Sequence, residues 1–247
     1  MRGLYAIYRK ELGQYFVSPV AYVVVGLFLL VTGHFFMVYV SYASGDQPDA
    51  PSWVLRAVLQ LFALIFLFLL PMVTMSAYAE EKKRGTLELL MTSPITELQI
   101  VLGKFLASMT LFAAMLLPTA GAIVYMWMHS DPAPPFRIVL GGYLGALLFG
   151  GALLALGTFL SSLTENQIIA AVLTFAAFLL LWAIDFGVQA AGGPTGQVLQ
   201  YLSVINHYDD FTRGILDTAG VTYYVSFMIL FLFLTVRSVD SMRWRRA

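Results

Sequence analysis

One short stretch of the chain combines charged and apolar residues in a way that suits binding to another surface. Two carboxylates, Glu80 and Glu81, precede three basic residues, and a leucine-rich stretch from Gly85 to Thr92 follows them. The spacing predicts a short helix here with one apolar face. That face consists of Leu87, Leu90 and Met91. Because such a face needs a protein groove or a membrane surface to cover it, the residues alone leave two interpretations open: a docking element, or an ordinary charged loop beside a membrane.

Capping residues define the ends of this segment, which we take as residues 79–100. Thr86 is placed to cap the short helix, and Ser93-Pro94 is placed to end it. Thr96 and Gln99 have the spacing of a capping box, which predicts that the next helix begins there. The short helix would therefore lie across the end of a helical bundle.

Residues that could catalyse a reaction are few and far apart. The chain has no cysteine and only three histidines, so thiolate nucleophiles, disulfides and cysteine metal sites are excluded. A membrane enzyme would need a nucleophile with a base, a carboxylate pair or a metal cluster. His207, Asp209 and Asp210 could suggest a metal site, but no second histidine is nearby. We therefore predict no metal site and interpret these three residues as polar groups at a membrane interface.

The composition requires a lipid environment. Of the 247 residues, 60% are hydrophobic and 11% are charged, against roughly 45–50% and about 25% in an average soluble domain. Fourteen basic residues balance fourteen acidic ones, so no basic domain is offered to nucleic acid. The lipid bilayer is the partner that this composition implies.

Six apolar runs are each long enough to cross a bilayer, which takes about 20 residues. They are Val20 to Tyr42, Val54 to Tyr78, Val101 to Met128, Ile138 to Leu163, Ile168 to Ala190 and Val221 to Val239. Backbone groups in hydrocarbon must be paired within the segment, so each run is predicted to be a helix. The fold class is therefore all-α, a polytopic membrane protein forming a single domain over residues 1–247. Pro71 and Pro118 lie inside two of the runs, where we expect kinks and not breaks.

The basic residues predict the orientation. With the N-terminus in the cytoplasm, most of them fall on the cytoplasmic side, and only Arg56, Arg137 and Arg213 fall outside. The cytoplasmic set is Arg2, Arg9, Lys10, Lys82, Lys83, Arg84, Lys104, Arg237, Arg243, Arg245 and Arg246. We expect both termini in the cytoplasm and the chain in the cytoplasmic (inner) membrane.

The first 18 residues predict an amphipathic helix that lies in the headgroup plane. Arg2, Arg9 and Lys10 gather on one side of it, and Ser18-Pro19 would end it. Its apolar side consists of Leu4, Tyr8, Leu12, Tyr15 and Phe16. The alternative is a charged flank that only anchors the first span.

The connection from 191 to 220 is too long for a turn and too apolar for a solvated loop. Apolar residues recur at helical spacing on both sides of Asn206 to Asp210. We predict two short helices that re-enter the outer half of the membrane. The residues assigned to this outer segment are His207, Asp209, Asp210, Phe211, Arg213 and Gly214.

Small residues line one face of the fourth span and predict close helix packing. They are Gly141, Gly142, Gly145, Ala146, Gly150 and Gly157. The sequence does not say whether the neighbouring helix belongs to this chain or to a second copy. Asp185, near the outer end of the fifth span, is interpreted as a hydrated acid in preference to a functional one.

The run from Glu80 to Phe105 resembles the signature of type-2 ABC transporter permeases, in which charged residues precede Gly-Thr-Leu-Glu and a proline follows. Within that family the chain is most similar to gliding-motility-type permeases, on Glu11 to Phe16, Ser18 to Tyr22 and His207 to Gly214. The resemblance implies a coupling helix at about Gly85 to Thr92 that sits in a cleft of an ATPase subunit. The implied coupling residues are Glu80, Glu81, Gly85, Thr86, Leu87, Glu88, Leu89, Leu90, Met91 and Pro94.

The resemblance also implies partners: an ABC ATPase subunit, a second permease chain and a companion membrane protein with an extracytoplasmic domain. No GxxxxGK[ST] phosphate loop is present, since Gly103-Lys104 continues into Phe105. We therefore expect a non-catalytic permease of an exporter that binds no cofactor itself, with ATP and Mg in the partner ATPase. The alternative function is an ion-coupled secondary carrier, which would need acids or bases near the midplane of the spans.

Overall fold

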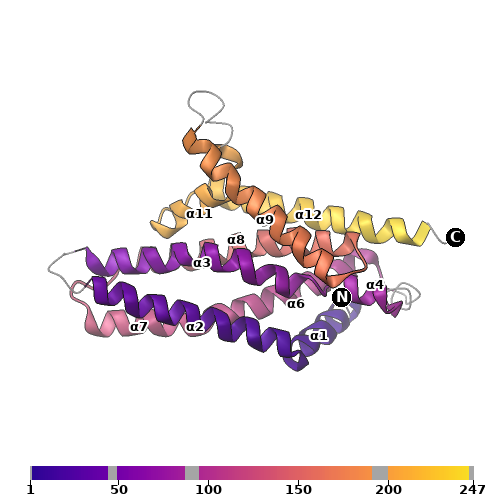
Figure 1. The fold of residues 1–247 in the computed structure, drawn as a ribbon, viewed down its shortest axis with the longest axis horizontal. Coiled ribbons are helices and arrows are strands. Elements are labelled where there is room, and N and C mark those ends of the chain that lie inside the picture. Colours follow the sequence, from indigo (N-terminus) through magenta and orange to yellow (C-terminus); the bar gives the residue numbers. More distant parts are fainter. Residues whose placement is uncertain (1, 44–48, 87–94, 191–199, 245–247) are drawn as a thin grey trace.

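A computed structural model describes residues 2–43, 49–86, 95–190 and 200–244 (Figure 1). Within these ranges the regular elements are helices and there is no strand. The all-α prediction is confirmed.

Six helical segments in the described ranges are long and apolar enough to cross a membrane, which confirms the predicted number. The bounds of the helices that form them are α2 Pro19–Tyr42, α3 Ala50–Thr74, α4 Ala79–Lys83, α6 Glu97–Leu116, η1 Leu117–Thr119, α7 Ala120–His129, α8 Phe136–Leu163, α9 Gln167–Ala190 and α12 Thr218–Trp244. The second span joins α3 to α4, and the third joins α6, η1 and α7. The bilayer requires each of these runs to satisfy its own backbone groups, and helices do so.

The two prolines have different effects. Helix α3 continues through Pro71 to Thr74. At Pro118 the α-helix gives way to the 3₁₀ turn η1 before α7 resumes. A proline removes one backbone hydrogen bond and crowds the preceding turn, and a short 3₁₀ stretch accommodates both effects.

Helix α8 forms the centre of the bundle and packs against α3, α6, α9 and α12. Its glycines allow the close approach: a Cβ added at Gly150 would lie 2.2 Å from the ring of Phe112 in α6. A Cβ added at Gly157 would lie 2.4 Å from Thr74 Oγ1 in α3. The small-residue face of α8 thus packs on helices of its own chain.

Helix α1 (Arg2–Val17) runs along α6. Ile7 and Glu11 are its buried side chains, and a Cβ added at Gly103 of α6 would lie 3.0 Å from Ile7 Cβ. Ser18 has an extended backbone and Pro19 begins α2, as Ser18-Pro19 predicted. The position of α1 in the headgroup plane stays a prediction.

The two ends of the described chain lie at the same end of the bundle as α4 (Figure 1). The C-terminal end of α2, the N-terminal end of α3 and the junction between α7 and α8 lie at the opposite end. The following sections call the first the α4 end and the second the α7 end.

Candidate functional site

The short helix α4 is held in place by a serine from the core helix. The Ser161 hydroxyl of α8 accepts hydrogen bonds from the backbone N–H groups of Tyr78 and Ala79, at 3.2 and 3.3 Å. The same hydroxyl donates to the Met75 carbonyl at 3.0 Å. One side chain therefore satisfies backbone groups at the end of α3 and at the start of α4 that have no partner within the helices.

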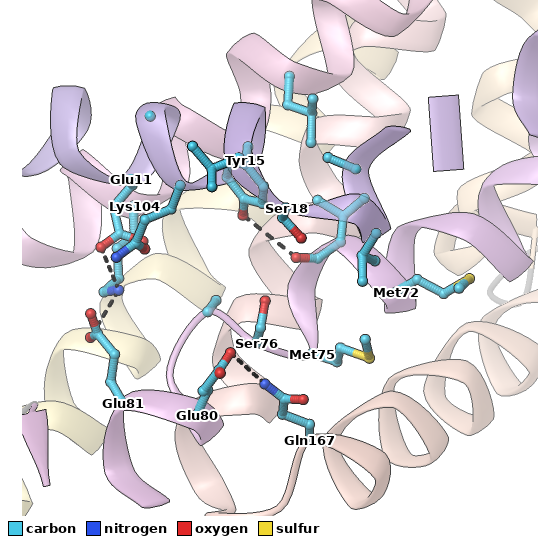
Figure 2. A pocket seen from close by; sticks show the side chains of 18 of the residues that line it. Glu11, Tyr15, Ser18, Met72, Met75, Ser76, Glu80, Glu81, Lys104 and Gln167 are labelled. Carbon is cyan, nitrogen blue, oxygen red and sulfur yellow. Dashed lines mark hydrogen bonds and ion pairs between the residues drawn. The ribbon is translucent and has the colours of Figure 1, made fainter. Parts of the chain in front are cut away.

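A buried lysine joins three helices at the α4 end (Figure 2). The Lys104 ammonium of α6 is 3% exposed and lies 3.0 Å from Glu11 Oε1 of α1 and 2.9 Å from Glu81 Oε2 of α4. Lys10 of α1 lies 2.9 Å from Glu81 Oε1 and 3.4 Å from Glu11 Oε1. We call Lys10, Glu11, Glu81 and Lys104 the ion cluster. Two cations face two carboxylates, so the cluster is electrically neutral.

The carboxylates of the ion cluster favour the charged form of Lys10. Burial alone would lower the pKa of Lys10, but its hydrogen bond to Glu81 and the charges of Glu81 and Glu11 outweigh this effect, so the pKa is raised. Lys104 also lies 5.3 Å from the centre of the buried Tyr78 ring, a distance at which a cation is attracted to the ring face.

A second set of contacts joins α4 to the end of α8 and the start of α9. Glu80 accepts a hydrogen bond of 2.6 Å from Gln167 Nε2 and pairs with Arg84. The Lys82 ammonium donates to the carbonyl of Ser162. Through these contacts and the ion cluster, α4 touches α1, α6, α8 and α9, so a displacement of α4 acts on four helices.

Part of the predicted coupling segment is described. Gly85 follows α4 with a φ of +68°, a conformation that glycine adopts at no steric cost. Thr86 Oγ1 donates to the Glu81 carbonyl at 3.3 Å. Thr96 and Gln99 form the predicted capping box at the start of α6, which is confirmed. The other predicted coupling residues, Leu87, Glu88, Leu89, Leu90, Met91 and Pro94, lie outside the described residues.

The ion cluster as a unit is not predictable from the sequence pattern. By that pattern Lys104 is one of the basic residues of the cytoplasmic flank, whereas the structure buries its side chain between α6, α1 and α4. The pattern also gives Glu11 no role in joining helices. A lysine within the otherwise apolar run Ile100 to Met115 was the available signal, because a charge in such a run requires a partner.

At the α7 end, helix α11 (Val204–Thr212) packs on α8, α9 and α3. The buried Tyr208 hydroxyl donates to the Leu59 carbonyl at 2.7 Å. Phe211 is buried, and a Cβ added at Gly145 would lie 2.4 Å from its Cβ. Gly214 ends this segment with a φ of +75°. Re-entry of this segment into the membrane stays a prediction, and residues 191–199, where the first of the two helices was expected, lie outside the described residues.

The polar residues of α11 make contacts within the chain. The His207 ring stacks on Tyr223 with centroids 4.3 Å apart, and its Nδ1 lies 2.8 Å from the Ser203 carbonyl. Asp209 accepts a hydrogen bond of 2.8 Å from Gln60 and pairs with Arg213. The described residues include no group of three histidine and acidic side chains that could hold a metal ion.

Asp185, the acidic residue of the fifth span, also has a hydrogen-bond partner at the α7 end. Asp185 accepts a hydrogen bond of 3.1 Å from the Ser203 hydroxyl, which precedes α11. The same hydroxyl accepts from the Asn206 backbone and caps α11. Asp185 thus connects α9 to the first turn of α11.

The comparison with known families decides the class of protein. A sequence model of the ABC-2 family transporter proteins matches residues 39–237. The chain belongs to this ABC-2 transporter family. The match covers α4, the ion-cluster residues Glu81 and Lys104, and α11. No curated protein matches the chain at a significant level.

Membership in the ABC-2 transporter family indicates the general function of the chain. The chain is a multi-pass membrane permease of an ABC transporter, and permeases of the ABC-2 family normally dimerise and work with an ABC ATPase. The ion cluster therefore lies in a transport subunit, and one of its members, Glu81, is among the residues that the family resemblance assigned to ATPase coupling.

Proposed function

We propose that this chain is the membrane subunit of an ABC exporter, and that it converts movement of a separate ATPase subunit into movement of its helices through α4. The observation that carries the proposal is the position of Lys104, which joins α4 to α1 and α6 from a buried site. ATP and Mg belong to the ATPase subunit, and the permease has no catalytic residue.

The physical argument is that α4 cannot move alone. Removing one partner from a buried ion pair costs about 3–5 kcal/mol, because the other charge is left buried without compensation. A displacement of the segment after Gly85 therefore moves α1 and α6 together with α4. Separating α4 from them would break the buried ion pairs and require the same free energy. Apolar docking by Leu87, Leu90 and Met91 would produce that displacement.

The proposal includes the orientation and the partners. The α4 end and both termini face the cytoplasm, and the membrane is the inner membrane. A second permease chain completes the transport path, and a companion membrane protein with an extracytoplasmic domain belongs to the same assembly. We place the chain among the gliding-motility-type permeases on Glu11 to Phe16, Ser18 to Tyr22 and His207 to Gly214.

The ion-coupled carrier is the weaker alternative. The carboxylates of the ion cluster are each held by a lysine, so neither offers an unpaired site for a transported ion, and the cluster lies near the end of its spans and not at the midplane.

Co-purification with the ATPase subunit tests the proposal. A Leu87→Ala, Leu90→Ala double variant should reduce both the recovery of the ATPase subunit and the ATPase rate per permease, because burial of each leucine is worth roughly 1.5–3 kcal/mol. Glu88→Lys, on a neighbouring face of the same helix, should have a milder effect. Recovery and rate at wild-type levels in the double variant would refute apolar docking.

A further inference from the structure

A cavity of about 1000 Å³ lies at the α4 end of the bundle, between α1, the start of α2 and the junction of α3 with α4. Its wall includes the ion cluster, but most of its lining belongs to residues that the coupling proposal does not use (Figure 2). This volume is at the upper end of the range of about 300–1000 Å³ that is typical of small-molecule sites.

The charged groups of the cavity wall compensate one another. The two carboxylates of the ion cluster contact its two ammonium groups. Glu80 is paired with Arg84 and also accepts a hydrogen bond from Gln167. A ligand with a net charge would therefore meet no unpaired countercharge among the described residues of this wall.

Three neutral polar side chains of the lining are available for a ligand. Within the described part of the chain, the side chains of Gln14, Ser18 and Ser76 make no hydrogen bond. Figure 2 shows Ser76 in the middle of the cavity, between the charged group formed by Glu11, Lys104 and Glu81 and the two methionines.

The opposite part of the lining is apolar. Met72 and Met75 lie there, and Val20, Val24 and Leu111 also line the cavity. Methionine side chains adapt their shape to apolar ligands. The cavity thus has a charged and polar part and an apolar part, and it lies between α1 and the ends of helices that are long enough to span a membrane.

We propose that this cavity binds a membrane lipid with a zwitterionic headgroup, such as phosphatidylethanolamine. The headgroup, which carries one positive and one negative charge, lies beside Ser76 and Gln14 without disturbing the neutral ion cluster. The beginning of the acyl chains lies against Met72 and Val24. The inference stands apart from ATPase coupling, because it concerns binding to the permease itself.

An anionic lipid fits less well. Its net negative charge would find no unpaired cation on this wall, because Lys10, Arg84 and Lys104 are each already paired with a carboxylate, and a buried charge without a partner is costly. The cavity should therefore distinguish phosphatidylethanolamine from phosphatidylglycerol with the same acyl chains.

Protection of single cysteines from a water-soluble maleimide tests the inference. The wild-type chain has no cysteine, and Ser76→Cys is nearly isosteric, so folding should be preserved. Gln14→Cys is a second reporter on the α1 wall. Leu106→Cys, on the exposed face of α6 and outside the cavity lining, reports non-specific coverage by lipid. Each variant is purified in maltoside micelles and titrated with either lipid.

The expected result is that phosphatidylethanolamine slows labelling of Ser76→Cys about tenfold when it is present at about ten times its dissociation constant. Gln14→Cys should also be protected, but at higher lipid concentration, because this substitution removes a proposed headgroup contact. Leu106→Cys should respond weakly and equally to both lipids, and phosphatidylglycerol should protect Ser76→Cys much less. Equal protection of Ser76→Cys by the two lipids would overturn the headgroup assignment. Protection of Ser76→Cys no greater than that of Leu106→Cys would overturn the site.

Discussion

The ammonium group of Lys104 lies 2.9 Å from a carboxylate oxygen of Glu81, and this contact joins the third spanning segment to the short helix α4. Lys104 belongs to α6, and Glu81 belongs to α4, which precedes the coupling helix expected from Gly85 to Thr92. The contact therefore places a buried electrostatic connection between the point where force would be applied and the helices that would move.

Loss of the Lys104 charge should destabilise the chain. Lys104→Met leaves the carboxylates of Glu11 and Glu81 with only Lys10 as a partner, and we expect a loss of about 3–5 kcal/mol. The measurement is denaturant-induced unfolding in micelles. Lys83→Met is the matched control, since Lys83 is exposed and a surface change of this kind stays within about 0.5 kcal/mol. Equal stability of the two variants would show that the ion cluster does not hold the α4 end together.

Alanine substitutions at the glycines of α8 should reduce stability by amounts that depend on which atoms the new methyl group would contact. At Gly145 an added Cβ meets Phe211 Cβ at 2.4 Å, which cannot move without the backbone of α11, whereas at Gly142 it meets the flexible end of Leu59 at 2.2 Å. Gly145→Ala should therefore cost more stability than Gly142→Ala. Gly26→Ala, where nothing lies within 4 Å, should be neutral or stabilising by up to about 1 kcal/mol. Thermal unfolding of the three variants in the same detergent gives the order, and a reversed order would contradict the packing account.

The Tyr208 hydroxyl should contribute to the attachment of α11. Tyr208→Phe removes its hydrogen bond to the Leu59 carbonyl and leaves a buried acceptor without this partner, so we expect a loss of about 1–3 kcal/mol. Tyr201→Phe is the control, because Tyr201 is largely exposed. A change in unfolding free energy of the same size for both variants would show that the bond to Leu59 contributes nothing specific.

The topology can be tested on the cysteine-free background. We expect a Ser241→Cys variant in intact cells to be unreactive toward an impermeant thiol reagent, since the α4 end should face the cytoplasm. Permeabilised cells provide the positive control. Labelling of intact cells at this position would invert the proposed orientation.

The spans could be predicted from sequence because the bilayer imposes a length and an apolar composition on each helix, and the capping box at Thr96 could be predicted because it is local. The ion cluster could not, since residues 10, 11, 81 and 104 meet only after α1 has packed along α6. The roles of Asp185 and His207 likewise depend on partners elsewhere in the chain, Ser203 and Tyr223. Local sequence patterns predict helices and their caps, whereas tertiary packing determines which polar groups come into contact.

The most direct test of the central claim is a charge swap within the ion cluster, measured as the permease-dependent ATPase rate of the complex with its ATPase subunit. Glu81→Lys and Lys104→Glu each unbalance the cluster, whereas the double variant restores two acidic and two basic groups. Such a cycle isolates the interaction between the two residues. We expect each single variant, normalised to assembled complex, to lose stimulation and the double variant to recover most of it. Wild-type stimulation in both single variants would contradict transmission through Lys104 and Glu81.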